Sequence, residues 1–216
     1  RKFKVQDNNL TLVSQAMELE GDSISISLDT QGLPYTWQSY LIEETPYNND
    51  FSNGQAGLPG HIQIRLLPVG EKEDTAGDPV IYIIPVEEYM QLWEENGDLS
   101  VSTVLDSIKD TLEDRPDTSS IEQIPVLPFE ELKSTDRLSV HSNYLEFDGW
   151  GGVRFLDFIP QDSYSVSGEE MQYIFQGFAG DSDQYLVAFF FPVGNPGLQD
   201  AFDIEYDAEE AVMDEP

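Results

Sequence analysis

Apolar and polar residues alternate along several short stretches of the chain, and this period of two is typical of β-strands with one buried face. Residues 23–28 (SISISL) and 61–66 (HIQIRL) show it most clearly. Residues 80–84 (VIYII) form a continuous apolar run, which predicts a central strand covered on both faces. The stretch 29–60 is rich in Gly, Pro and Asn and predicts a long turn-rich connection. Its aromatic residues expected to pack onto the core are Tyr35, Trp37 and Tyr40.

Two helices are expected in the middle of the chain. Residues 86–93 follow a proline and predict a short helix. Within residues 100–114, apolar positions recur at steps of three and four, which is typical of an amphipathic helix with one face on the core. We expect its N-cap at Ser100 or Ser102, because a serine side chain can accept a hydrogen bond from a first-turn amide. The apolar positions are Val101, Val104, Leu105, Ile108 and Leu112.

The last third of the chain carries strand patterns only. Residues 137–193 are predicted to form a four-strand antiparallel meander, with glycine-containing turns at 148–152 and 180–183. The 100–114 helix should pack on one face of this meander. The order of elements therefore predicts an α+β fold, an antiparallel sheet with two helices packed on one face. The expected strands are 138–147, 153–159, 171–178 and 185–191.

The domain organisation is expected to be simple. We predict a single α+β domain over residues 1–202, in which the polar residues 1–9 form a loose N-terminal arm. The connector at 115–128 is interpreted as a crossover from helix to sheet. Residues 203–216 contain seven acidic residues and no Lys or Arg, which predicts a mobile acidic tail.

The net charge narrows the classes of function. The 216 residues include 42 Asp and Glu but 10 Lys and Arg, giving a formal net charge of −32. Nucleic acid is excluded as a partner because phosphate contacts require clustered cations. An aromatic content of 12% still predicts a packed core. Two explanations of the acidity remain open: a saline or divalent-rich habitat, or an acidic extracellular protein of an ordinary organism.

Other features of the composition exclude further classes. The chain has no cysteine, so it can form neither disulfides nor thiolate metal sites and has no thiol nucleophile. The longest apolar run, residues 185–193, is too short to span a bilayer. The first residues include neither Met nor an apolar leader, as expected of a mature or trimmed chain.

Six short segments follow one another in a recognisable order. They are 80–89 (VIYIIPVEEY), 124–128 (IPVLP), 144–147 (YLEF), 152–156 (GVRFL), 173–178 (YIFQGF) and 191–196 (FPVGNP). Their order and spacing over roughly residues 58–198 resemble a family of uncharacterised secreted bacterial proteins and lipoproteins. The chain departs from that pattern at Trp150, where a small residue is expected, and at 179–184, where the turn is longer. The resemblance implies an extracellular or cell-surface location, either as a secreted protein or as a chain derived from a lipoprotein, and it implies no activity.

The sequence nominates no catalytic or cofactor-binding residue. It contains no Gly-x-Ser-x-Gly elbow, no paired-histidine zinc motif, and no phosphate-binding or dinucleotide-binding glycine loop. His141 lies within a predicted strand and is kept as a candidate ligand contact. Arg154 also lies within a predicted strand. It forms either an exposed ion pair with a neighbouring strand, or a buried anchor or ligand contact.

Calcium is the one metal that the composition favours, because its ligands are oxygen atoms. The loop that starts at Asn49 fails the EF-hand spacing, since Phe51 occupies a ligand position. The candidate metal ligands are Asp181 and Asp183, which are two residues apart in a predicted turn. Asp157, between two apolar residues, is expected to point outward from its strand.

We therefore expect a secreted or cell-surface acidic protein that acts by binding or assembly rather than by catalysis. Divalent cations, further copies of the chain and a cell-surface component are its candidate partners. Two alternatives remain open. One is an extracellular hydrolase with a carboxylate-based site, and the other is a subunit of an extracellular filament or sheath.

Overall fold

The structure is a computed structural model that describes nine stretches of the chain. The arm predicted at 1–9 and the acidic tail predicted at 203–216 lie outside the described residues. The described stretches are 13–19, 22–28, 33–48, 57–71, 78–116, 124–127, 138–147, 150–158 and 171–193.

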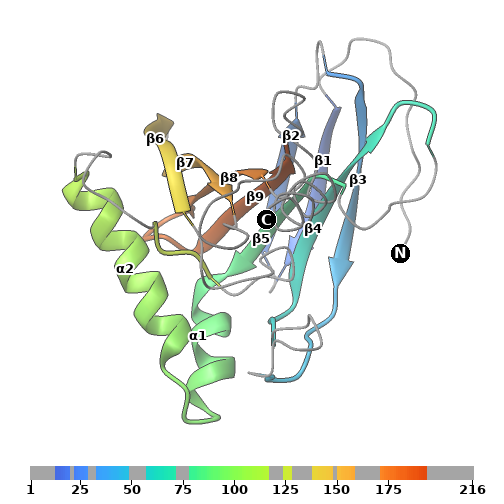
Figure 1. Cartoon of the computed structure of the whole chain (residues 1–216). Coiled ribbons are helices and arrows are strands. Elements are labelled where there is room, and N and C mark those ends of the chain that lie inside the picture. Colours follow the sequence, from blue (N-terminus) through green and yellow to red (C-terminus); the bar gives the residue numbers. More distant parts are fainter. Residues whose placement is uncertain are drawn as a thin grey trace, which may run out of the picture.

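A seven-stranded antiparallel sheet organises the fold (Figure 1). Its strand order is β3-β4-β5-β9-β8-β7-β6. The helices α1 (Val86–Glu94) and α2 (Ser100–Asp114) lie together on one side of it. The strands are β3 (Tyr35–Ile42), β4 (His61–Pro68), β5 (Val80–Pro85), β6 (Leu138–Phe147), β7 (Trp150–Phe158), β8 (Met171–Ala179) and β9 (Tyr185–Pro192).

The predicted α+β class is confirmed, but the predicted meander is only part of the sheet. Strands β6 to β9 do follow one another with antiparallel pairing. Strand β9 also pairs with β5, from Val80 opposite Phe190 to Pro85 opposite Tyr185. This pairing joins segments far apart in the sequence, and local periodicity carries no information about it.

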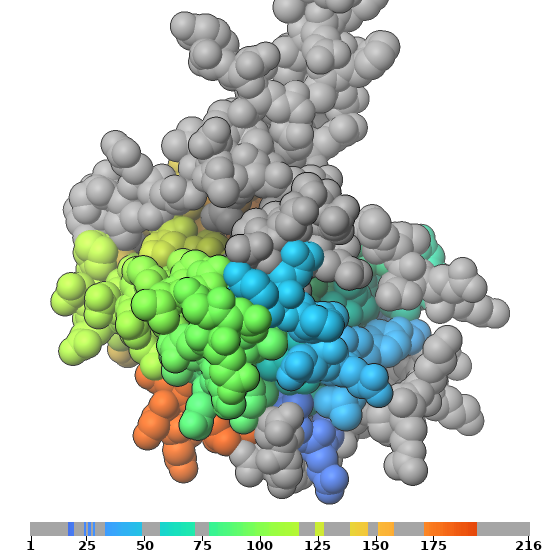
Figure 2. Space-filling model, turned by 90° about the horizontal axis from the view of Figure 1, so that it is seen from below, coloured from blue at the N-terminus to red at the C-terminus, as the bar shows by residue number. Residues whose placement is uncertain are grey.

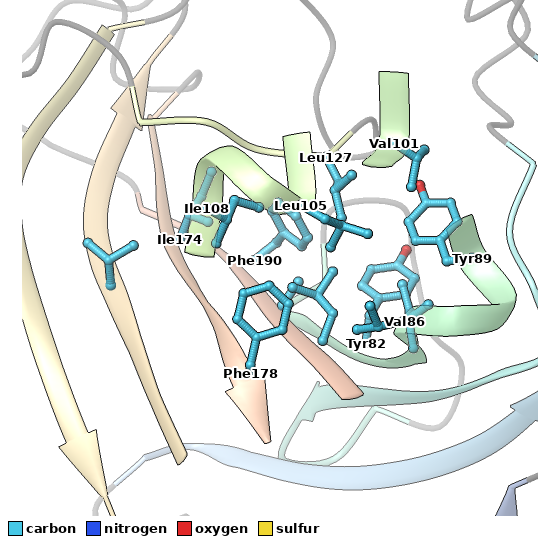
Figure 3. Close-up of a cluster of buried hydrophobic side chains, with 14 of the residues drawn as sticks. Tyr82, Val86, Tyr89, Val101, Leu105, Ile108, Leu127, Ile174, Phe178 and Phe190 are labelled. Atoms are coloured by element: carbon cyan, nitrogen blue, oxygen red, sulfur yellow. The ribbon is translucent and has the colours of Figure 1, made fainter. Parts of the chain in front are cut away.

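The main core lies between the helices and the sheet. Val101, Leu105 and Ile108 on the inner face of α2 are at most 1% exposed, which confirms the predicted amphipathic helix. In Figure 3 this face of α2 lies against apolar side chains of the sheet, including Phe178 and Phe190. Burial of such side chains contributes about 1.5–3 kcal/mol each, so this layer is a main source of stability.

The start of α2 differs from the prediction. Its N-cap is Leu99 rather than a serine. Oδ1 of Asp98 accepts hydrogen bonds from the backbone N–H of Ser100 at 2.9 Å and from its hydroxyl at 2.6 Å. These bonds hold the pKa of Asp98 below its ordinary value. A carboxylate just before the helix thus binds a first-turn amide, and the serine is its donor.

A separate two-stranded hairpin packs on a second core cluster. It consists of β1 (Val13–Leu19) and β2 (Asp22–Leu28). Its buried residues Met17, Leu19 and Ile26 cluster with Ile62 and Ile64 of β4. Ile81 and Ile83 of β5 pack against the same cluster, whereas Val80, Tyr82 and Ile84 of that strand belong to the core beneath the helices. The prediction that residues 80–84 form a strand covered on both faces is confirmed.

A strand also lies within the stretch 29–60, which was wrongly predicted as turn-rich throughout. Strand β3 pairs with β4 along its whole length and forms an edge of the sheet. Trp37 packs against the hairpin cluster, while its neighbours Thr36 and Gln38 are polar. The alternation of apolar and polar residues in β3 is hard to recognise for two reasons. The surrounding residues are rich in Gly, Pro and Asn, and an edge strand needs few apolar side chains.

The rest of this connection is attached to the helices. The Tyr47 ring meets the Trp93 ring of α1 edge to face, with centroids 5.3 Å apart. The Trp93 indole N–H donates to the carbonyl of Gly57 at 2.9 Å. The Tyr47 hydroxyl donates to Oδ2 of Asp98 at 3.1 Å. Figure 2 shows the light-blue surface of residues 33–48 bordering the green surface of the helices.

His61 begins β4 and is 2% exposed. Its Nδ1 lies 2.8 Å from the carbonyl oxygen of Pro59, and its ring centroid lies 5.7 Å from that of Tyr82. Burial lowers the pKa of His61, and the bond to Pro59 partly opposes that shift. The folded protein therefore holds this ring neutral at pH values where an exposed histidine takes up a proton.

We expect stability to fall as the pH decreases through about 6.5, the ordinary pKa of histidine. Below that value the unfolded chain binds a proton that folded His61 resists, so the unfolded state is favoured. The denaturant midpoint of wild type should drop more between about pH 7.5 and pH 5.5 than that of His61→Gln. His141→Gln is the matched control, because His141 is exposed. An equal pH response of wild type and His61→Gln would contradict the prediction.

Candidate binding pocket

A pocket of about 440 Å³ lies between the C-terminal half of α2 and the corner of the sheet formed by β6, β7 and β8. This volume is within the range of about 300–1,000 Å³ typical of small-molecule sites. The lining comprises charged side chains, an apolar wall and two strand glycines. Three of these residues come from α2 and one, Arg115, is its C-cap, while the others come from the sheet and the β8–β9 turn.

The charged lining consists of two cations and two carboxylates: Lys109, Arg115, Glu113 and Asp183. The Lys109 ammonium lies 4.0 Å from Oδ2 of Asp183 and 5.2 Å from the centroid of the Phe178 ring. Arg115 forms an ion pair with Glu146 of β6. All four ion-pair partners are exposed, and such pairs contribute little to stability. Their side chains therefore remain available to a ligand.

Arg115 ends α2 in an unusual backbone conformation. Its φ of 45° is left-handed, and its N–H donates to the carbonyl of Thr111 at 3.1 Å. Glycine is the usual residue at such a helix end, because the left-handed conformation costs other residues about 1–2 kcal/mol. The chain thus has an arginine at a position where the backbone favours glycine.

The apolar wall is formed by Leu112, Tyr144 and the largely buried Phe178. Leu145 also lines the pocket, but by strand alternation its side chain lies on the sheet face opposite the helices. The Tyr144 hydroxyl donates to the carbonyl of Pro116 at 3.3 Å. Burial raises the pKa of Tyr144, and the charge of Arg115 acts in the opposite direction. The Tyr144 side chain therefore adds a neutral ring and a hydroxyl to the wall.

The floor of the pocket includes Gly151 of β7. In the sheet register it lies between Glu146 of β6 and Phe178 of β8. A Cβ built at this position would have its closest contact with the carbonyl oxygen of Leu145 at 3.3 Å. This contact is tight but would require the Leu145 carbonyl to move by only a few tenths of an ångström, far less than the overlaps that a Cβ would meet at Gly152 or Gly177. The absent side chain leaves the backbone open to the pocket.

The neighbouring glycines have a different explanation. A Cβ at Gly152 would lie 2.5 Å from the Phe175 ring, and a Cβ at Gly177 would lie 2.2 Å from the carbonyl oxygen of Gly151. These two residues allow β7 and β8 to approach closely. The prediction of a turn at 148–152 was therefore wrong for residues 150–152, which are part of strand β7.

Arg154 and His141, the predicted ligand contacts, do not line the pocket. Arg154 is exposed, and by strand alternation it lies on the sheet face opposite the helices. Its direct neighbours are Asn143 and Phe175, so the structure supports neither a buried anchor nor a pair with a carboxylate directly opposite. His141 is exposed with a φ of 55°, at the irregularity between Val140 and Asn143 of β6.

The predicted metal ligands lie in the β8–β9 turn, and both are exposed. Asp183 lines the pocket and pairs with Lys109, whereas Asp181 does not line it. Within the described stretches no three His, Asp or Glu side chains gather in a group that could hold a metal ion. Calcium binding stays a prediction.

Asp157 is buried, not outward-pointing as expected. It is 3% exposed and lies in the layer beneath residues 124–127. The Ser139 hydroxyl donates to Oδ1 of Asp157 at 3.5 Å and accepts from the backbone N–H of Ile124 at 3.2 Å. Nearby, the Gln176 side-chain amide donates to the carbonyl of Pro125. These polar groups attach the 124–127 segment to the sheet and do not belong to the pocket.

In the part of the chain that the structure describes, no helix has the length and apolar character needed to cross a membrane. Comparison with known proteins gives no match to a family model, to a curated protein or to a solved structure.

Proposed function

We propose that the protein is an extracellular or cell-surface binding protein, and that the pocket between α2 and β6–β8 holds its ligand. The extracellular setting rests on the net charge of −32 and on the resemblance to secreted proteins. The binding role rests on the residues that line the pocket. Of the four Lys and Arg residues in the described stretches, two line it.

The observation that carries the proposal is a pair of residues that local backbone preference does not explain. Arg115 occupies a left-handed position where glycine would be favoured, and it lines the pocket. Gly151 occupies a strand interior where a Cβ would meet one backbone atom closely but overlap none, and it lines the pocket. Local conflicts with the fold of this kind are expected at functional sites. A binding role would explain both residues, because Gly151 keeps the pocket open and Arg115 supplies a guanidinium to it.

The chemistry of the lining suits binding. The two cations donate hydrogen bonds and the two carboxylates accept them, while Leu112 and Tyr144 supply an apolar surface. Both ion pairs are exposed, so a ligand can reach the charged groups without opening the core. The geometry therefore supports recognition of a small polar molecule.

If the pocket is functional, changing Gly151 or Arg115 should weaken ligand binding without a large loss of stability. Gly151→Val should change the free energy of unfolding by no more than about 1 kcal/mol, because relief of the cost of glycine inside a strand opposes the tight contact of the new Cβ with the Leu145 carbonyl oxygen. Arg115→Gly should leave stability unchanged or raise it by about 1 kcal/mol, since the strain removed exceeds the value of an exposed ion pair. Denaturant midpoints test both values. A loss of several kcal/mol in either variant would show that the residue is required by the fold.

The binding test is a thermal-shift screen of mono- and disaccharides, amino acids and small carboxylic acids on wild type and on both variants. We expect at least one class to raise the melting temperature of wild type and to leave Gly151→Val unshifted. Arg154→Met is the control, because that cation lies on the opposite face, and it should respond like wild type. A screen without a hit, or a hit that shifts Gly151→Val equally, would refute the pocket. If Arg154→Met alone lost the ligand-induced rise in melting temperature, the binding site would lie on the sheet face opposite the helices.

A further inference from the structure

We infer that the pocket binds a neutral saccharide, an inference that rests on the proposed function and specifies its ligand. The argument has three parts: the charges of the lining cancel, the polar groups occur as donor–acceptor pairs, and an apolar wall stands beside them. Each part distinguishes a neutral polyhydroxylated ring from the charged ligands that arginine and lysine would otherwise suggest.

The charge balance argues against an ionic ligand. Lys109 already has Asp183 as a partner, and Arg115 already has Glu146. An anion would have to displace a carboxylate from one of these cations, within a chain whose net charge is −32. A cation would face Lys109 and Arg115 at close range. The four charged residues of the lining, namely the cations Lys109 and Arg115 and the carboxylates Glu113 and Asp183, sum to zero, so the lining itself favours neither sign of ligand charge.

The same pairs suit hydroxyl groups. A sugar hydroxyl both donates and accepts a hydrogen bond. The Lys109–Asp183 pair offers a donor next to an acceptor 4.0 Å away. Arg115 and Glu113 add a second donor group and a second carboxylate to the lining. The Tyr144 hydroxyl, which donates its proton to Pro116, adds a hydrogen-bond acceptor to the lining. A ring with several hydroxyls can engage these groups without breaking the charge balance.

The remaining lining suits the apolar side of a sugar ring. Leu112 lines the pocket from α2 and Tyr144 lines it from β6. Gly151 adds no side chain to the lining. Phe178 is 4% exposed, so it supports Lys109 from below rather than stacking on the ligand. A pyranose could place its C–H groups on this surface and direct its hydroxyls to the charged pairs.

The test is isothermal titration calorimetry with sugars that share a ring but differ in charge. The neutral probes are cellobiose, maltose, lactose, mannobiose and xylobiose, and the charged probes are glucuronate and glucosamine. We expect at least one neutral disaccharide to bind more tightly than both charged probes. Its affinity should change less than about twofold between roughly 0.05 and 0.5 M NaCl, because screening acts only on charges. Lys109→Met should weaken it by about tenfold through the lost hydrogen bond, and Arg154→Met should not.

Other outcomes separate this inference from the proposed function. Binding of glucuronate, glucosamine or an amino acid that Gly151→Val abolishes, with no neutral sugar bound, would overturn the saccharide assignment and leave the pocket as the binding site. A neutral sugar that binds Gly151→Val as well as wild type would place the sugar elsewhere and overturn both. The assignment also fails if no neutral probe binds wild type.

Discussion

Replacing Gly177 by alanine should destabilise the protein by about 3 kcal/mol or more, toward the upper end of the cost of overpacking. The new Cβ would lie 2.2 Å from the carbonyl oxygen of Gly151 and 2.7 Å from the Cα of Gly152. These are backbone atoms of β7, so no side-chain rotation relieves the contact. Strands β7 and β8 would have to separate at the corner that carries the pocket.

Gly151→Ala is the matched control for this change. It adds the same methyl group to the same pair of strands, but its closest contact is 3.3 Å. Chemical denaturation should give this control a midpoint close to that of wild type, and Gly177→Ala a much lower one. Equal midpoints for the two variants would mean that β7 and β8 are not as close as the structure places them.

Trp93→Ala should cost about 3–5 kcal/mol, as is typical when a buried large aromatic side chain is removed. Trp93 is 1% exposed and contacts the rings of both Tyr47 and Tyr89. Its indole N–H also binds the carbonyl of Gly57. The variant therefore loses core packing and the attachment of the 43–48 segment to α1 at once.

Trp93→Phe separates these two contributions. It keeps a ring against Tyr47 but leaves the Gly57 carbonyl without its donor, which costs about 1–3 kcal/mol. Hydrogen exchange adds a local measurement, because the amide of Leu58 donates to the Thr45 hydroxyl oxygen beside this contact. Faster exchange of the Leu58 amide is expected in both variants. Unchanged exchange in Trp93→Ala would show that the connection is held by other contacts.

The elements that the sequence predicted best are those whose neighbours are close in the chain. The inner face of α2 is read from steps of three and four residues, and it is buried where the periodicity places it. Strand β5 is read from an unbroken apolar run, and both of its faces are covered. In both cases the positions that are buried are the apolar positions of the local pattern, so the pattern alone identifies them.

The errors have a common physical origin, which is that glycine has several unrelated uses. Gly151 and Gly152 follow an Asp-Gly pair, and together they resemble an extended turn. Only the position of β8 shows that Gly152 makes room for the Phe175 ring and that Gly151 needs no such room. Likewise, strand β3 is visible only once β4 is paired with it.

The candidate site was not predictable for the same reason. Lys109 and Arg115 are ordinary exposed positions of a helix in the sequence, and Asp183 is one acid among 42 Asp and Glu residues. The two contacts that the sequence favoured, Arg154 and His141, were chosen because their residue types are rare in this chain. Rarity says nothing about which face of a strand a side chain occupies.

By itself, the sequence determined the strand and helix segments with strong periodicity, the α+β class and the charge of the surface, because each depends on residues close in the chain or on composition alone. The tertiary structure decided that β5 pairs with β9, that β1 and β2 cover the second face of β4, and that α2 lies over the β6–β8 corner. That last contact brings Lys109, Arg115 and Gly151 around one pocket. Their meeting depends on long-range packing, which leaves no periodic signal in the sequence.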